Sequence, residues 1–174
     1  ARLRASNLDI ENASNTGIKL RNSEDVILDS NSVTSSGQRG IHATDTTRLY
    51  IRNNRVRLAG TWGVHLDSSD NGPTVDGALV AFNTIQAATT GGIRLENVRG
   101  TIRDNILSEI GSIGIKTNVA PTNIHHNNLF AVPRLFDEES EEPSRRWSNS
   151  TLEPGFVDAA GGDDGGLAAL VEMR

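Results

Sequence analysis

The sequence predicts an all-β solenoid, in which short strands of successive coils lie parallel and stack on one another. Three observations predict it. A glycine-led motif recurs at a nearly fixed period, an asparagine recurs in phase with it, and apolar residues alternate with other residues around both. Periods of about 20 to 50 residues are typical of repeat architectures. Alternation at period two is typical of strands and not of helices.

The first repeated element is a glycine followed by an apolar residue, a variable residue and usually a second apolar residue. Successive glycines are 23, 23, 29 and 22 residues apart. We interpret each copy as a strand entered through a sharp turn, for which glycine permits a positive φ. The five copies are Gly17–Leu20, Gly40–Ala43, Gly63–Leu66, Gly92–Leu95 and Gly114–Thr117.

The second repeated element is an apolar residue, two variable residues and an asparagine, with another apolar residue two positions later. A buried side-chain amide can bond the equivalent amides of neighbouring coils while it turns the chain. We therefore expect an asparagine ladder along the solenoid. The copies are Leu28–Asn31, Ile51–Asn54, Val80–Asn83, Ile102–Asn105 and Ile124–Asn127.

Each repeat thus holds three short strands joined by turns, which describes a parallel β-helix with strands about 4.8 Å apart. On the glycine strands and the asparagine ladder, residues 7–130 resemble the right-handed parallel β-helix proteins of the pectate-lyase-like superfamily. The resemblance implies a single-stranded helix of about six coils. Residues 1–13 fit a shortened first coil, with Leu8 and Ile10 in place and Ala13 at the asparagine position. An uncovered first coil would favour self-association, unless the chain is a piece of a longer protein.

We divide the chain into a β-helix, residues 1–130, and a C-terminal loop or cap segment, residues 131–174. The period is lost after residue 130, where an acidic cluster begins. Such a cluster is most simply solvated surface; it comprises Asp137, Glu138, Glu139, Glu141 and Glu142. Residues 153–163 resemble a segment common near the C-terminal end of bacterial β-helix proteins. The tail is therefore expected to cover the last coil.

Composition excludes several classes of protein. A chain of 174 residues is one domain by size, and no run of 18 apolar residues is present to span a membrane. The absence of cysteine excludes disulfides and thiolate metal sites. A net charge of −5 argues against general nucleic-acid binding. A secreted, periplasmic or cell-surface location follows only from the resemblance.

A basic column is the main functional feature of the sequence. The first outward-facing positions of the glycine strands are Lys19, His42, His65, Arg94 and Lys116. In the resembled family the outer face of this strand usually forms the substrate groove. Like charges about 5 Å apart repel one another, so we expect carboxylates or an anionic ligand to offset them. The column predicts an acidic polysaccharide, such as a polyuronate, as partner.

Three residues complete the predicted groove. Asp67 and Glu96 occupy the next outward position and can pair with the column. Trp62 precedes Gly63 in the turn, where an exposed ring would give a sugar a flat surface to stack on. An insertion, residues 67–77, lengthens one repeat to 29 residues and would form a wall beside His65.

Three functions remain open from these residues. The first is β-elimination or C5-epimerisation of uronates, with His65 or His42 as base, Arg94 or Lys116 neutralising the carboxylate, and Lys19, Lys116 and Trp62 binding substrate. The second is hydrolysis by Asp67 and Glu96, about 5 Å apart as in retaining enzymes. The third is a non-catalytic carbohydrate-binding, structural or assembly β-helix. The Asp-Pro-His-Glu motif of epimerases and the paired aspartates of polygalacturonases are both missing.

We predict no cofactor and no zinc or copper site. His125 and His126 are adjacent on a strand, so they face opposite sides or a turn and cannot easily bind one ion together; His42 and His65 are the other two histidines. Calcium stays open, because lyases of the resembled family often use it. The insertion offers oxygen ligands for it, although their spacing is not that of a known calcium loop; they are Asp67, Asp70, Asn71 and Asp76.

Overall fold

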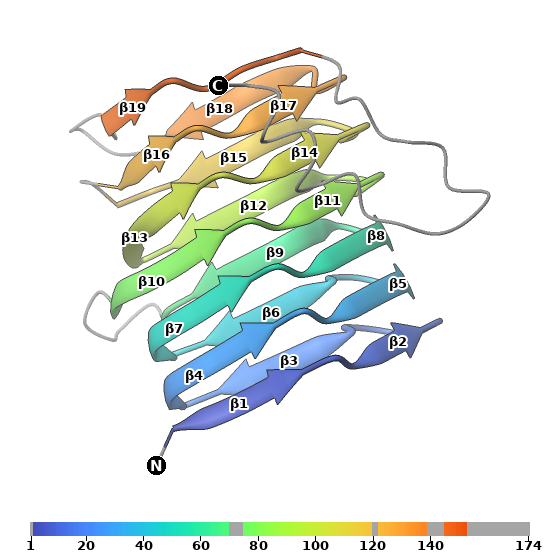
Figure 1. Cartoon of the computed structure of the whole chain (residues 1–174), viewed down its shortest axis with the longest axis vertical. Coiled ribbons are helices and arrows are strands. Elements are labelled where there is room, and N and C mark those ends of the chain that lie inside the picture. Colours follow the sequence, from blue (N-terminus) through green and yellow to red (C-terminus); the bar gives the residue numbers. More distant parts are fainter. Residues whose placement is uncertain (1, 70–74, 120–121, 139–144, 153–174) are drawn as a thin grey trace.

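The computed structural model describes residues 2–69, 75–119, 122–138 and 145–152, in which 19 strands and no helix are present. The strands form three parallel sheets (Figure 1). Sheet A contains β1 (Leu3–Ser6), β4 (Glu24–Asp29), β7 (Thr47–Arg52), β10 (Val75–Ala81), β13 (Val98–Arg103), β16 (Asn123–His125) and β19 (Arg145–Trp147). Sheet B contains β2 (Asp9–Glu11), β5 (Ser32–Ser36), β8 (Arg55–Ala59), β11 (Thr84–Gln86), β14 (Ile106–Ser108) and β17 (Asn128–Phe130). Sheet C contains β3 (Ile18–Arg21), β6 (Ile41–Thr44), β9 (Trp62–Asp67), β12 (Gly91–Glu96), β15 (Ile113–Thr117) and β18 (Arg134–Glu138).

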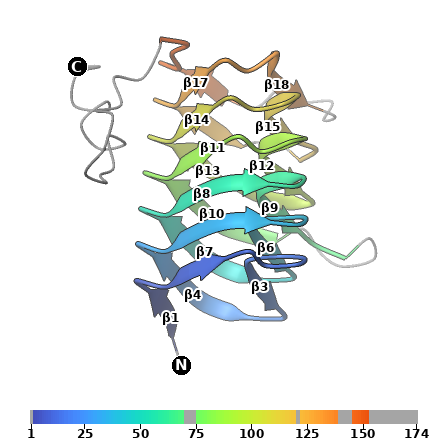
Figure 2. The ribbon, with the colours of Figure 1, turned by 90° about the vertical axis from the view of Figure 1, so that its right-hand side faces the viewer.

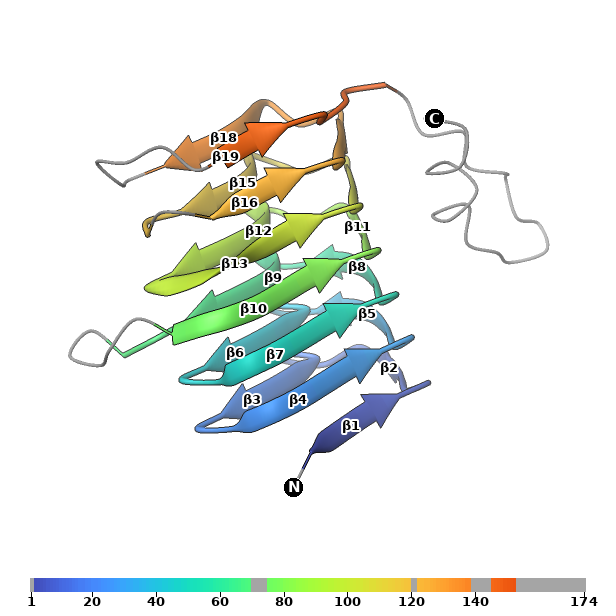
Figure 3. The same cartoon turned by 60° about the vertical axis from the view of Figure 1, so that its left-hand side comes forward.

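Each of the first six coils contributes one strand to each sheet, β19 adds a seventh strand to sheet A, and successive coils stack along one axis (Figures 2 and 3). Equivalent residues face each other in register, as Ile41 does Val64 in sheet C. Apolar side chains from all three sheets fill the interior, and those of sheet C are buried as predicted: Ile18, Ile41, Val64, Ile93 and Ile115. The predicted parallel β-helix of about six coils is confirmed.

The asparagine ladder is confirmed and is longer than expected. It lies between sheets A and B, and the side-chain oxygen of each member accepts the backbone N–H of the preceding member at 2.9–3.1 Å. The ladder runs from Asn31 to Asn149 through Asn54, Asn83, Asn105 and Asn127. Ala13 was wrongly expected to hold the ladder position of the first coil. Leu8 holds it, because β2 pairs with β5 in the register Asp9 to Ser32 and the Leu8 N–H donates to Asn31.

The coils also continue past residue 130, where the sequence was expected to lose its period. Strand β18 pairs with β15, β19 pairs with β16, and Ser150 bridges to Asn128. The glycine motif is missing there because Leu135 stands opposite Gly114, yet Phe136 still faces Ile115. Three residues of the acidic cluster, Glu139, Glu141 and Glu142, lie outside the described residues. The segment 153–174, expected to cover the last coil, lies outside them too.

The repeated glycines are required for space and not for a positive φ. Among the described glycines only Gly77 has a positive φ. A Cβ on Gly63 would lie 2.3 Å from Ile85 Cγ2 and 2.9 Å from the carbonyl oxygen of Gly92. Gly40 is equally crowded, by Val56 and by the carbonyl of Gly63. The glycine column therefore lets the beginning of each sheet C strand pack against sheet B and against the next coil.

We expect Gly63→Ala to lower the free energy of unfolding by about 1–3 kcal/mol, the usual cost of overpacking. Denaturant unfolding measures it. Ile85→Ala removes one of the two crowding atoms, so its cost should be smaller in the Gly63→Ala background than in the wild type. Unchanged stability of Gly63→Ala would contradict this explanation.

Candidate functional site

The predicted basic column lies on the outer face of sheet C in the expected register. Its members face one another from coil to coil: Lys19 with His42, His42 with His65, His65 with Arg94, and Arg94 with Lys116. The second predicted column is also formed, because Asp67 of β9 faces Glu96 of β12. Strand alternation thus brings the five predicted catalytic residues, His42, His65, Asp67, Arg94 and Glu96, onto one face.

Carboxylates offset the cations of the column. Arg94 Nη2 lies 2.8 Å from Glu96 Oε1, and Lys116 Nζ lies 3.3 Å from Asp137 Oδ2. Asp137, placed by the sequence in solvated surface, extends the column because β18 pairs with β15. Lys19 is exposed at the opposite end. The expected repulsion between like charges is therefore relieved within the protein.

His65 is buried, with its side chain 3% exposed. Arg39 Nε donates to His65 Nδ1 at 2.8 Å, which places the imidazole proton on Nε2, 3.3 Å from Glu96 Oε2. Burial lowers the pKa of His65 to about 3; Asp67 opposes this shift, and Arg39 and Arg94 add to it. His65 is therefore a neutral imidazole at physiological pH, with its proton directed at a carboxylate.

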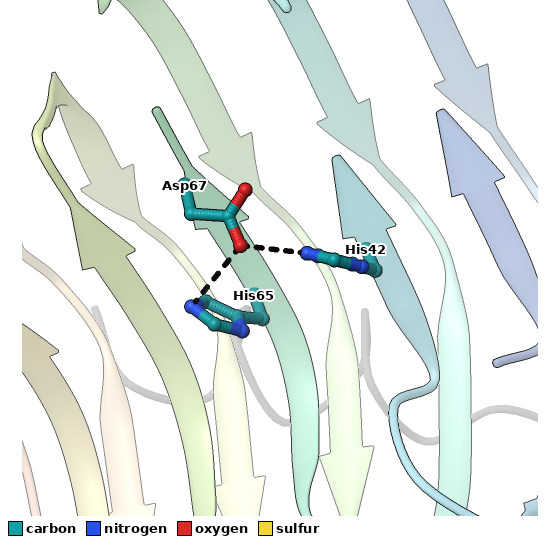
Figure 4. Close-up of side chains that lie close together, drawn as sticks. All are labelled: His42, His65 and Asp67. Atoms are coloured by element: carbon teal, nitrogen blue, oxygen red, sulfur yellow. Dashed lines mark hydrogen bonds and ion pairs between the residues drawn. The ribbon is translucent and has the colours of Figure 1, made fainter. Parts of the chain in front are cut away.

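His42 is the second buried imidazole and stacks on His65, with ring centroids 5.2 Å apart. Its Nε2 lies 2.8 Å from Asp67 Oδ2, and the same oxygen is 3.8 Å from His65 Nε2 (Figure 4). Burial raises the pKa of Asp67 and is the largest single effect, but His42, Thr44 and His65 together outweigh it, so the net pKa is lowered. Asp67 is therefore an ionised carboxylate between two imidazoles. Arg39, which sequence analysis missed, reaches this cluster from the turn before β6, and only its place before Gly40 could have signalled it.

Trp62 differs from its expected position. It lies in β9 and not in a turn, and it is only 6% exposed. Gly91 of the next coil makes the room, since a Cβ there would lie 2.1 Å from Trp62 Cζ3. The Arg94 guanidinium lies over the ring at 5.8 Å from its centroid. The prediction that Trp62 offers a sugar an exposed stacking surface is therefore wrong, and the ring packs against the Arg94 guanidinium instead.

The insertion is described only at its two ends. The candidate calcium ligands Asp70 and Asn71 lie outside the described residues. Asp76 pairs with Arg99 at 3.6 Å, and Asp67 is engaged by the imidazoles. At the near end, Asp45 accepts the Ser69 N–H at 2.8 Å, which fixes the chain after β9. Of the four candidate ligands, the two described ones are therefore paired with protein groups.

Comparison with known proteins agrees with this architecture. A family model described as a right-handed β-helix region matches residues 1–134. The chain belongs to the right-handed β-helix family. No curated protein and no solved structure matches it in the other two comparisons. Within the described residues, no helix is long and apolar enough to cross a membrane.

Membership of the right-handed β-helix family establishes the fold but not the chemistry, which has to be inferred from the residues of the site. In this β-helix the site combines a neutral imidazole, an ionised carboxylate and guanidinium groups on one sheet face. Such groups can bind anions and move protons. These ionisable side chains project from the outer face of sheet C and are buried there by their neighbours, so they do not pack in the apolar core. Buried ionisable groups outside the core make the cluster a functional candidate.

Proposed function

We propose that this β-helix binds an acidic polysaccharide along the outer face of sheet C. The observation that carries the proposal is the register of Lys19, Arg94 and Lys116 on one column. A polymer laid along the stacking axis meets a new coil about every 4.8 Å. Its carboxylates can replace Glu96 and Asp137 as partners of Arg94 and Lys116. Guanidinium groups suit this exchange because they bind carboxylates through two parallel hydrogen bonds.

Elimination or C5-epimerisation at the same face is the second candidate, favoured by the proximity of the five predicted residues. Arg94 would neutralise the uronate carboxylate, and a neutral imidazole suits the removal of the adjacent C–H proton. Here His65 Nδ1 is occupied by Arg39 and His42 Nε2 by Asp67. Because neither imidazole offers these nitrogens to a substrate, the geometry supports binding better than catalysis.

Hydrolysis has the least support. It requires one carboxyl group to carry a proton while the other is ionised. The lowered pKa of Asp67 keeps this residue ionised. Glu96 accepts from both Arg94 and His65, so protein groups already engage this carboxylate.

We expect Arg94→Ala and Lys116→Ala each to weaken binding of polygalacturonate or alginate about tenfold, the effect of one charge-assisted contact. Isothermal titration calorimetry at two salt concentrations measures it, since added salt should weaken the wild-type affinity. Ultraviolet absorbance of the unsaturated product, followed in the same samples, reports elimination if it occurs.

The matched control is Arg55→Ala, which removes an exposed cation from β8 in sheet B. It should leave the affinity unchanged. Equal losses in Arg55→Ala and Arg94→Ala, or equal binding of a neutral dextran, would contradict a site on sheet C.

A further inference from the structure

The cluster of His42, His65 and Asp67 brings three potential metal ligands together. Asp67 Oδ2 lies 2.8 Å from His42 Nε2 and 3.8 Å from His65 Nε2. One ligand atom from each residue lies within 4.8 Å of the other two, the one such group in the described part of the chain. Figure 4 shows both rings directed at the same carboxylate. Strands β6 and β9 hold these residues in place through direct pairing.

The hydrogen bonds within the cluster do not provide a partner for every buried polar atom of its side chains. His42 Nδ1 and Asp67 Oδ1 are both buried and have no hydrogen-bond partner among the described residues. The side chain of His42 is 8% exposed and that of His65 is 3% exposed. Buried polar atoms without partners are costly, and a bound water or ion is one way in which a native site supplies the missing partner. The cluster therefore has the features of a ligand site and not of a surface ion pair.

We propose that His42, His65 and Asp67 bind one divalent transition metal ion through His42 Nε2, His65 Nε2 and Asp67 Oδ2. Two imidazoles and one carboxylate suit zinc, iron, nickel or copper, whereas calcium and magnesium prefer oxygen ligands alone. Ligand bonds of about 2.0–2.2 Å place the ligand atoms of a tetrahedral zinc site about 3.4 Å apart. The distances of 2.8 and 3.8 Å lie on either side of that value, and the third pair of ligand atoms lies within 4.8 Å. Changes of at most about 1.4 Å in any of these separations would therefore form the site.

Two neighbouring residues define how the ion would be held. Glu96 Oε2, 3.3 Å from His65 Nε2, can supply a fourth ligand or leave that position to water or a substrate oxygen. Arg39 opposes the ion, because coordination through His65 Nε2 moves the imidazole proton to Nδ1, where Arg39 now donates. Arg39 must then turn away. The proposal therefore predicts that removing Arg39 strengthens metal binding.

The test is titration of chelator-treated protein with Zn²⁺ by calorimetry and with Co²⁺ by visible absorption. We expect one ion per chain, and a loss of affinity of about 100-fold or more in His42→Ala and in Asp67→Asn. Asp67→Asn is isosteric and can still accept a hydrogen bond from His42, and circular dichroism checks that each variant folds. Arg39→Ala should bind about tenfold more tightly.

The matched control is the double variant His125→Ala/His126→Ala, which removes the histidine pair at the end of β16. It should bind both ions as the wild type does. The proposal is overturned if the wild type binds no ion, if Asp67→Asn keeps its affinity, or if only the control loses binding. An unchanged or weaker affinity of Arg39→Ala contradicts coordination through His65 Nε2. None of these readouts depends on polysaccharide binding, so the two proposals fail separately.

Discussion

Replacing Asn83 by alanine is expected to lower the free energy of unfolding by about 3–6 kcal/mol. The Asn83 side-chain oxygen accepts from the backbone N–H and the side-chain amide of Asn54. Its amide group donates to the carbonyls of Ile51 and Ala81 and to the side chain of Asn105. All these bonds are buried, and each buried polar group left without a partner costs about 1–3 kcal/mol. A total stability of about 5–15 kcal/mol is usual for a domain, so the loss should be large.

Chemical denaturation of Asn83→Ala beside Asn15→Ala measures this effect. Asn15 is exposed, and the one hydrogen bond of its side chain is with Thr16 at the surface. Exposed substitutions of this kind usually change stability by less than about 0.5 kcal/mol. Equal stabilities of the two variants would show that the ladder orders the turn without stabilising the fold.

The sequence alone could predict the repeating part of the fold because stacking gives equivalent residues equivalent surroundings. An asparagine that bonds the next coil must recur wherever the coils stack, and so must a glycine that leaves room for a branched side chain. The first coil has Leu8 in place of the asparagine, and the last coil keeps Asn149 but has Leu135 in place of the glycine. Backbone hydrogen bonds to a neighbouring coil hold the strands of these two coils in place. Such bonds do not require a particular residue type, so the sequence does not reveal them.

The site could be predicted in part for a related reason. Alternation along a strand determines which side chains face outward, so the members of the two columns were predictable. Alternation does not determine how far a long side chain reaches. Arg39 contacts His65 across 26 residues, and Trp62 lies over Gly91. The contact of Arg39 determines the tautomer of His65. The packing of Trp62 over Gly91 buries the ring on which a sugar was expected to stack.

Acidification is expected to destabilise the protein between about pH 6.5 and pH 3, chiefly because of His65. The unfolded chain binds a proton at His65 below its ordinary pKa of 6.5, whereas in the folded protein burial delays protonation to about pH 3. The unfolded state therefore binds more protons throughout this window. The free energy of unfolding has its full value above pH 6.5 and decreases as the pH falls below 6.5. At about 1.4 kcal/mol per pH unit, the loss reaches at most about 5 kcal/mol.

Urea unfolding at several pH values, with a chelator present to exclude metal, measures this dependence. Asp67 acts in the same direction but only below its ordinary pKa of 3.8. In the interval from pH 6.5 to pH 4, His125 adds to the slope, because burial lowers its pKa as well. His65→Gln should flatten the curve in that interval, because glutamine has no proton to gain there and its oxygen can accept from Arg39. His126→Gln is the control, since this imidazole is exposed and lies outside the cluster of His42, His65 and Asp67. A wild-type stability that stays constant from pH 6.5 to pH 4 would mean that His65 is protonated in the folded state, with Asp67 and Glu96 outweighing its burial.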